Sequence, residues 1–221
     1  MFAGAIIVVW EGMEGAGKTT LMKRVGEMLS SKGYRVAYYK TPSGTAMGRF
    51  AAEFGNKPGT DPLTRMLLFL ANTSSDSKIM REKILEERPR YFFIDRYYLC
   101  SITYGLAYAR LQEADITPED FINLLKIIEK TGSKVLLRPD LHVIVDVEES
   151  VRMRRLERQG GGGRLDEELE RSAMMQDYVR KFYQVFHEWR RENSLWVENP
   201  EGRLNETAEK VAERILQLKV G

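Results

Sequence analysis

Eight residues near the start of the chain, Gly12–Thr19, read GMEGAGKT and match the phosphate-loop pattern G-x-x-x-x-G-K-[ST]. Glycine has no Cβ, so such a loop can curl around a phosphate and direct its backbone N–H groups inward. Lys18 can reach the β- and γ-phosphates, and Thr19 offers a hydroxyl to Mg²⁺. The residues predicted to bind a nucleoside triphosphate here are Gly12, Met13, Glu14, Gly15, Ala16, Gly17, Lys18, Thr19 and Thr20.

The segments that flank this loop supply the context that the motif requires. Residues 5–10 form an apolar run rich in β-branched side chains, which is typical of a strand buried in a parallel sheet. Residues 18–31 carry apolar side chains at helical spacing, and Gly33 follows as a stop signal. The alternative is a chance glycine-rich turn, which would match the four fixed positions in about 1% of such chains. The sequence therefore favours nucleotide binding.

Composition sets the broad class of the protein. The chain has 221 residues, of which 43% are hydrophobic and 30% charged, as in an ordinary globular domain. No apolar run is long enough to span a bilayer, so no membrane association is expected. The single cysteine, Cys100, excludes an intramolecular disulfide and favours the cytoplasm. The net charge of +2 gives no argument for nucleic-acid binding.

Basic residues are concentrated in one segment, between Arg152 and Arg164. This segment holds five arginines and one glutamate, a larger positive excess than that of the whole chain. Such a cluster favours a polyphosphate ligand, with RNA as the weaker alternative. Four consecutive glycines at 160–163 lie within it and predict a hinge, so we expect a lid around residues 154–168 that closes over the phosphates and excludes water.

Apolar and amphipathic stretches alternate along the rest of the chain. Strands are expected at 5–10, 35–39, 91–94, 141–147 and 195–197, and helices at 18–31, 47–54, 63–87, 98–111, 118–130, 149–158, 166–193 and 205–218. The LLFLA segment at 67–71 is apolar on nearly every side and is expected to be buried. The pattern predicts one doubly wound α/β domain over residues 1–221, a parallel sheet of about five strands with helices on both faces.

The ordered set of short motifs resembles the thymidylate kinase family of P-loop nucleoside monophosphate kinases. The matching segments are EGMEGAGKTT at 11–20, PSGT at 42–45, LLFLAN at 67–72, DRY at 95–97, PDLHVIVDV at 139–147 and RLDE at 164–167. The phosphate loop alone identifies only a superfamily, whereas this set covers nearly the whole chain. The resemblance implies transfer of the γ-phosphoryl group of ATP to dTMP, giving dTDP, with Mg²⁺ as cofactor.

The resemblance also assigns roles in the acceptor half of the site. Glu14 would accept a hydrogen bond from the sugar 3′-hydroxyl, Arg96 would bind the acceptor phosphate bidentately, and Phe69 would stack on the base. The alternatives are a solvated carboxylate for Glu14, a surface ion pair for Arg96 and a core position for Phe69. The predicted acceptor-binding residues are Glu14, Lys40, Phe69, Thr73, Arg96 and Tyr104.

Metal and lid residues complete the predicted set. Asp95 follows a buried strand and, with Thr19, would hold Mg²⁺, although a helix N-cap is the alternative role for Asp95. Members of the family place a catalytic arginine in the phosphate loop or in the lid. Gly15 occupies the loop position, so the resemblance implies the lid-arginine type, with Arg155 against the adenine. The predicted catalytic residues are Lys18, Asp95, Arg96 and Arg164, with Arg158 as second choice in the lid.

Four departures from the family pattern fall in the acceptor half. Thr73 stands where the family has an arginine that contacts O4 of thymine. Lys40 also stands at a family arginine position, and lysine keeps the positive charge but cannot donate two parallel hydrogen bonds as arginine does. Cys100 and Gly105 replace a serine and a glutamine. Two alternatives therefore stay open: a deoxynucleoside monophosphate kinase with a broader or different base preference, and a non-catalytic P-loop ATP-binding protein.

A partner chain is also expected. The helix at 98–111 has more apolar positions than one core-facing stripe needs, which suggests a packed partner, and the family forms homodimers. Neither histidine, His142 or His187, has a partner at metal-ligating spacing, so both are expected to be structural or exposed. ATP, dTMP and a second copy of the chain are thus the expected partners.

Overall fold

The computed structural model describes residues 4–158 and 172–219. Its five strands form one parallel sheet in the order β2–β3–β1–β4–β5. The strands are β1 (Ile6–Gly12), β2 (Val36–Lys40), β3 (Tyr91–Asp95), β4 (Leu141–Asp146) and β5 (Ser194–Glu198). The described helices are α1 (Lys18–Ser31), α2 (Ala46–Gly55), α3 (Pro62–Glu87), α4 (Tyr98–Leu111), α5 (Pro118–Thr131), α6 (Glu149–Arg158), α8 (Ala173–Trp189) and α9 (Leu204–Leu216), with a 3₁₀ turn at Arg191–Asn193. This confirms the predicted fold class.

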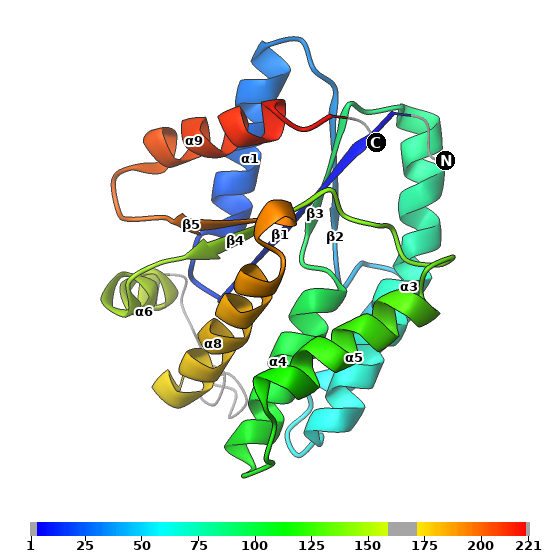
Figure 1. Cartoon of the computed structure of the whole chain (residues 1–221), viewed down its shortest axis with the longest axis vertical. Coiled ribbons are helices and arrows are strands. Elements are labelled where there is room, and N and C mark those ends of the chain that lie inside the picture. Colours follow the sequence, from blue (N-terminus) through cyan, green and yellow to red (C-terminus); the bar gives the residue numbers. More distant parts are fainter. Residues whose placement is uncertain (1–3, 159–171, 220–221) are drawn as a thin grey trace.

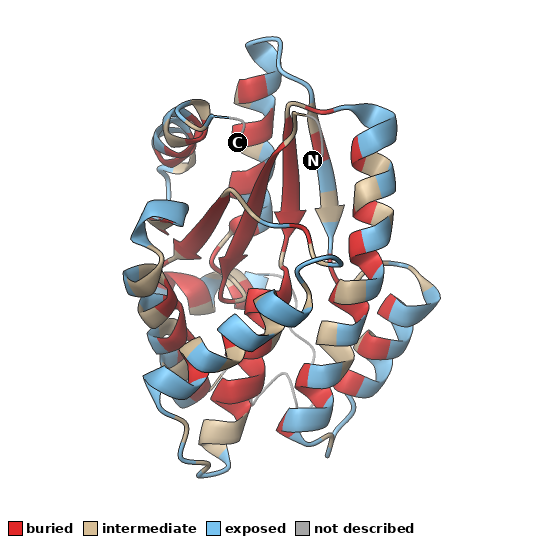
Figure 2. Cartoon of the chain, turned by 45° about the vertical axis from the view of Figure 1, so that its right-hand side comes forward, coloured by how far each residue is buried: buried red, intermediate tan, exposed pale blue. Residues whose placement is uncertain are grey.

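Helices cover both faces of the sheet, as Figure 1 shows. Alternate residues of β1, among them Ile6, Val8 and Trp10, pack with α1 and α9 on one face. Ile7 and Val9 point the other way and pack with α3, α4, α5 and α8. The three central strands, β3, β1 and β4, are therefore almost wholly buried, whereas the edge strands β2 and β5 keep some exposed residues and the helices expose their outer sides (Figure 2). Burial on both faces explains why the strands read as continuous apolar runs.

The strand register brings the chemical motifs to one edge of the sheet. Trp10 of β1 lies beside Asp95 at the end of β3, and Lys40 at the end of β2 is on the other side of Asp95. The phosphate loop leaves β1 at the same edge and leads into α1. Ligands of open parallel sheets bind beyond the carboxyl ends of the strands, where neighbouring connections diverge. The fold thus brings the predicted site together.

The predicted burial of the centre of α3 is wrong. Leu67 is 53% exposed, and Ala71 is also exposed. The helix instead buries a polar stripe, which consists of Asn72, Thr73, Asp76 and Ser77. Ser77 donates or accepts a hydrogen bond with the Tyr97 hydroxyl at 2.8 Å, and Asp76 accepts one from Ser43 at 2.8 Å. Tertiary hydrogen bonds therefore decide which face of this helix turns inward.

The apolar excess of α4 has an explanation within the chain. Ten of its residues are buried, and they pack mainly against α3, α8 and α5. A central helix surrounded by others is expected to be apolar on most sides. The inference of a partner chain from this helix is therefore wrong.

The long predicted helix at 166–193 is shorter in its described part. It begins at Ala173, where the Ser172 hydroxyl accepts from the Met175 N–H at 3.2 Å, and ends at Trp189 before a 3₁₀ turn. Residues 166–171 of the prediction lie outside the described residues, as do residues 159–168 of the predicted lid.

Candidate active site

The phosphate loop connects the end of β1 to the first turn of α1. Gly12, Gly15 and Gly17 all have positive φ angles, of 131°, 78° and 85°. The Lys18 side chain is buried, and its ammonium group donates to the Met13 carbonyl at 2.9 Å. Free N–H groups at the start of α1 and the Lys18 charge together make this loop an anion site.

Neighbouring segments give the loop glycines a second role beyond phosphate access. A Cβ on Gly12 would lie 2.2 Å from the Val145 carbonyl oxygen of β4. A Cβ on Gly17 would lie 2.6 Å from Nδ2 of Asn199. The glycines therefore also permit close packing of the loop against β4 and the loop after β5.

Asn199 was not predicted from the sequence, yet it supports the phosphate loop. It is 4% exposed, and its amide donates to the Ala16 carbonyl at 2.8 Å. It opens the Asn199-Pro200 turn after β5, and an Asn-Pro pair indicates a turn. That signal locates the turn but does not indicate which distant loop it contacts.

Thr19 and Asp95, the two predicted metal ligands, are in direct contact. The Thr19 hydroxyl donates to Oδ2 of Asp95 at 2.6 Å, and Asp95 is 2% exposed. Among the described residues no group of three or more His, Cys, Asp or Glu side chains could hold a metal. One hydroxyl and one carboxylate suit Mg²⁺, which keeps several waters and binds few protein oxygens. This pair fits the predicted ion.

A cavity of about 540 Å³ extends from this pair along the phosphate loop. Its walls include Gly15, Gly17, Lys18, Thr19, Thr20, Lys40, Asp95, Arg96, Arg155, Arg158, Asn199 and Leu204. Met13 and Ala16 have buried side chains, so of these two residues only the backbone is available to a ligand. The cavity is thus lined both by predicted ATP-binding residues and by Lys40, which was predicted to bind the phosphoryl acceptor.

A second, smaller cavity of about 250 Å³ lies between α3 and α4. Four predicted acceptor residues line it together with Arg96: Glu14, Phe69, Thr73 and Tyr104. Glu14 and Arg96 line both cavities and therefore stand where the two meet. Lys40 lines only the larger cavity, so it lies on the phosphate side and not beside the base.

Arg96 has an unusual backbone conformation for an arginine. Its φ angle is 67°, in the left-handed region, which costs about 1–2 kcal/mol for a residue with a Cβ. Its guanidinium donates to the Cys100 sulfur at 2.9 Å and lies 5.5 Å from the centre of the Tyr104 ring. The conformation aims a fixed cation at the junction of the two cavities.

Arg65 lines the acceptor cavity and was missed by the sequence analysis. It is 8% exposed, lies 5.4 Å from the Phe69 ring centre and donates to the Gly55 carbonyl at 2.9 Å. Arg65, Phe69 and Thr73 follow each other at four-residue intervals, so they share one face of α3. The four-residue spacing from Phe69 could therefore have indicated that Arg65 lines the same cavity.

Asn72 also lines the acceptor cavity, and it is 1% exposed. Its Nδ2 donates to Asp76 at 2.9 Å, whereas its Oδ1 has no hydrogen-bond partner among the described residues. A buried carbonyl oxygen without a partner is costly unless a ligand supplies a donor.

The arginines of α6 do not all face the phosphates. Arg155 donates to the Ala16 carbonyl at 3.1 Å and to the Asn199 carbonyl at 3.0 Å, so it holds the phosphate loop against the loop after β5. Arg158 lines the cavity but pairs with Glu201 at 3.0 Å on the exposed surface. Arg152 is buried and pairs with Glu149 at 2.7 Å. Arg164 lies outside the described residues.

A buried carboxylate lies beneath the site. Glu11 is 0% exposed and accepts from the Tyr97 N–H at 3.2 Å and from the Tyr183 hydroxyl at 3.3 Å. Burial raises the pKa of Glu11 to about 8, against the opposing effect of Arg96 and Lys18. Burial likewise lowers the pKa of Lys18 to about 7, with a further contribution from Arg96.

Comparison with known proteins identifies the family. A family model described as thymidylate kinase matches residues 10–211 of the chain. The chain belongs to the thymidylate kinase family. The match includes the phosphate loop and the acceptor cavity, so the activity is that of an ATP-dependent dTMP kinase. Among the described residues no helix has both the length and the apolarity needed to cross a membrane.

Individual relatives agree with this assignment. A probable thymidylate kinase of Archaeoglobus fulgidus is 28% identical over 97% of this chain and 98% of its own. A thymidylate kinase of Caldicellulosiruptor saccharolyticus is 31% identical over 82% of this chain and 81% of its own. A crystal structure of thymidylate kinase from Ehrlichia chaffeensis, 20% identical, covers 97% of this chain and 99% of its own with a TM-score of 0.64, which supports the fold.

Proposed function

We propose that the two joined cavities bind ATP and dTMP end to end within one catalytic domain, with their phosphates meeting near Arg96. The observation that carries this proposal is the position of Glu14 and Arg96 in the walls of both cavities. The larger cavity, with Lys18 and the start of α1, takes the triphosphate. Arg155 and Leu204 also line this cavity, and we assign the adenine to them, because a guanidinium and an apolar side chain suit an aromatic ring.

Lys18, Arg96 and Lys40 supply the positive charge for phosphoryl transfer. Charge in the transition state spreads over the oxygens of the transferred group, and fixed cations in a partly closed site stabilise it. The left-handed backbone of Arg96 holds its guanidinium ready for the acceptor phosphate. Mg²⁺, held by Thr19 and Asp95, would neutralise charge on the donor phosphates when bound. We assign Glu14 to the sugar 3′-hydroxyl of dTMP.

For the lid, we retain Arg164 as the first choice of catalytic arginine. Arg158 would first have to leave its ion pair with Glu201, whose carboxylate also pairs with Arg154. An exposed ion pair contributes only about 0–1 kcal/mol, so this release is cheap. Arg158 therefore stays the second choice.

Thymine recognition is assigned to Arg65 and Asn72 in addition to the predicted Phe69, Thr73 and Tyr104. Arg65 carries donors for O4 of thymine, on the same helix face as Thr73, where the family arginine is missing. The unpartnered Oδ1 of Asn72 can accept from the N3–H group. Phe69 and Tyr104 provide ring surfaces for the base.

The test is an ADP-release assay with Mg-ATP and each of dTMP, dUMP, dCMP, dGMP and dAMP. We expect dTMP to be the best acceptor and Arg65→Met to lower its kcat/KM about tenfold or more, with a smaller effect on dCMP. Lys78→Met, on the exposed side of the same helix, serves as the control. An unchanged preference in Arg65→Met would assign base recognition elsewhere, and activity in Lys18→Ala would remove the phosphate loop from the mechanism.

We also propose that the chain forms a homodimer through α2 and α3. These two helices pack against each other, and α2 together with the first two turns of α3 exposes five large apolar side chains. They are Met47, Phe50, Phe54, Leu63 and Leu67, each between 38% and 59% exposed. Clustered apolar side chains of this size on a surface mark an interaction site. A cytoplasmic location is proposed because Cys100 is a buried free thiol.

Sedimentation tests the dimer. Phe50→Asp with Leu67→Asp should convert a dimer into a folded monomer. Leu85→Asp, which changes an equally exposed leucine at the far end of α3, should leave the dimer intact. A wild-type chain that sediments as a monomer at tens of micromolar would contradict the proposal.

A further inference from the structure

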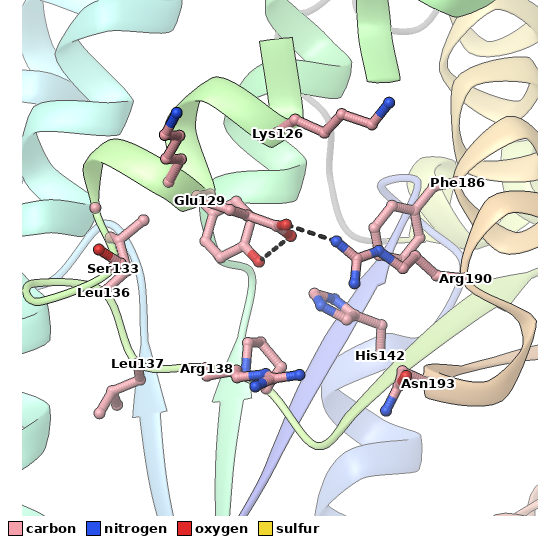
Figure 3. A pocket seen from close by; sticks show the side chains of 14 residues that line it. Lys126, Glu129, Ser133, Leu136, Leu137, Arg138, His142, Phe186, Arg190 and Asn193 are labelled. Atoms are coloured by element: carbon pink, nitrogen blue, oxygen red, sulfur yellow. Dashed lines mark hydrogen bonds and ion pairs between the residues drawn. The ribbon is translucent and has the colours of Figure 1, made fainter. Parts of the chain in front are cut away.

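A third cavity, of about 530 Å³, lies away from the active site. It is enclosed by the C-terminal ends of α5 and α8, the loop before β4 and the start of β4 itself (Figure 3). None of its lining residues belongs to the two catalytic cavities. His142, the second residue of β4, lines it, whereas the kinase site lies beyond the carboxyl ends of the strands. Its size is that of cavities which hold small organic ligands.

The walls of this cavity are positively charged. Lys126, Lys130, Arg138 and Arg190 line it, against the single carboxylate of Glu129. Glu129 is already engaged, because it accepts from Arg190 at 2.6 Å and from the Tyr98 hydroxyl at 3.0 Å. Among residues 4–158 and 172–219, no carboxylate lies within 4 Å of the charged groups of Lys126, Lys130 or Arg138.

The charged side chains form the rim of the cavity. Lys126, Lys130 and Arg138 are all exposed. In the view of Figure 3, Lys126 lies above the Glu129–Arg190 pair and Arg138 lies below it. Three exposed cations around one opening attract an anion and leave its charge partly hydrated.

The inner wall differs from the rim, because it is aromatic. His142 is 4% exposed, and its ring packs edge-on against Phe186 with 4.8 Å between ring centres. The Tyr98 ring lies 6.3 Å from that of His142. Figure 3 shows the His142 ring pointing from β4 toward the cavity, beside Arg190. A flat ring of a ligand would find both aromatic surface and a polar edge here.

Two polar atoms of this inner wall lack partners among the described residues. They are Nδ1 of His142 and Nε of Arg190, both buried. Burial, followed by the charge of Arg190, lowers the pKa of His142 to about 3, so the imidazole is neutral at physiological pH. Buried polar groups are normally hydrogen-bonded, which makes this pair a place where a ligand would supply the missing partner.

We propose that this cavity is a second nucleotide-binding site, separate from the kinase site. The base lies against His142 and Phe186, with its polar edge toward the unpartnered nitrogens, and the phosphates lie between Lys126 and Arg138. An inorganic anion would satisfy the rim but would leave the aromatic wall and the volume unused. The division into a cationic rim and an aromatic floor therefore favours a nucleotide.

Binding must be measured with the kinase site blocked. The full chain is saturated with a bisubstrate compound in which adenosine and thymidine are joined 5′ to 5′ by five phosphates. ATP, GTP, dTTP and dTMP are then titrated by calorimetry, with inorganic pyrophosphate as the comparison. We expect one further equivalent of at least one nucleotide per chain, with a Kd at least tenfold lower than that of pyrophosphate.

Variants locate the binding. The pair Lys126→Glu and Arg138→Glu should raise the Kd at least tenfold, as should His142→Phe, which keeps a ring and removes both nitrogens. Lys134→Glu makes the same single charge reversal as Arg138→Glu, on the same loop before β4 but at an exposed residue outside the cavity, and should have no effect. Kinase turnover should be unchanged in all four substitutions, which separates this proposal from that for the catalytic site.

Three results would overturn the proposal. The first is the absence of any further nucleotide equivalent at millimolar concentration, and the second is equal binding of pyrophosphate. The third is binding that survives the charge reversals at Lys126 and Arg138. The rim variants change only exposed side chains, so they test the site even where His142→Phe fails to fold.

Discussion

The buried carboxylate of Glu11 makes the stability of this protein depend on pH in a defined direction. Its pKa is about 8 in the folded chain, against 4.5 ordinarily, because burial disfavours the charged form. Between these two values the unfolded carboxylate is ionised while the folded one is protonated, so unfolding releases a proton. The free energy of unfolding therefore falls as pH rises, by about 1.4 kcal/mol per pH unit. From pH 5 to pH 7.5 the loss from this group is roughly 3 kcal/mol.

Glu11→Gln removes this titration and keeps the shape of the side chain. The amide oxygen can still accept from the Tyr97 N–H, which the carboxylate does now at 3.2 Å. We propose to measure the free energy of unfolding by urea denaturation at a series of pH values, with circular dichroism as the signal. We expect the free energy of unfolding of the variant to increase relative to that of the wild type as pH rises. The gain should reach roughly 3 kcal/mol between pH 5 and pH 7.5. Glu27→Gln, at a residue whose side chain is 63% exposed, should show no such trend.

Parallel stability curves for the wild type and Glu11→Gln would refute this reasoning. They would mean that Arg96 and Lys18, which favour the carboxylate, outweigh burial and keep Glu11 ionised. The same experiment thus decides whether Glu11, which lies beneath the active site, is neutral or charged at physiological pH.

Two further substitutions test the local geometry. Gly12→Ala places a Cβ 2.2 Å from the Val145 carbonyl oxygen and should lower the free energy of unfolding by more than about 3 kcal/mol. Gly33→Ala is the control: this glycine also has a positive φ, but no atom lies within 4 Å of the added Cβ, so the loss should be about 1 kcal/mol. Similar losses for the two variants in urea denaturation would show that β4 shifts to make room for the added methyl group. Arg155→Met should raise the KM for ATP about tenfold, equivalent to ~1.4 kcal/mol, with little change in kcat. Arg154→Met is its control, and equal KM values in the two variants would remove Arg155 from the donor site.

Some of the site could be predicted from the sequence because its chemistry depends on neighbours in the chain. The loop Gly12–Thr19 carries its glycines, lysine and threonine within eight residues, and its flanking strand and helix are recognisable from periodicity. Asp95 could be placed beside Thr19 because parallel strands end at one edge of the sheet, and the 2.6 Å hydrogen bond confirms that proximity. Short-range spacing and strand order were sufficient here.

The rest depends on which distant segments meet. Leu67 and Ala71 are apolar and yet exposed, while Asp76 and Ser77 are buried, because these two polar side chains hydrogen-bond to Ser43 and Tyr97 from other parts of the chain. No local pattern shows that Asn199 supports the phosphate loop 183 residues away.

The sequence by itself therefore determined the phosphate-binding loop, since that chemistry is contained in one contiguous motif, and the resemblance of its ordered motifs to the thymidylate kinase family predicted the reaction. Only the tertiary structure decided which side chains line the cavity between α3 and α4 and which form the cavity at the start of β4. Those sets join helices from separate parts of the chain, and the packing of those helices is set by the sum of many small contacts that no single segment encodes.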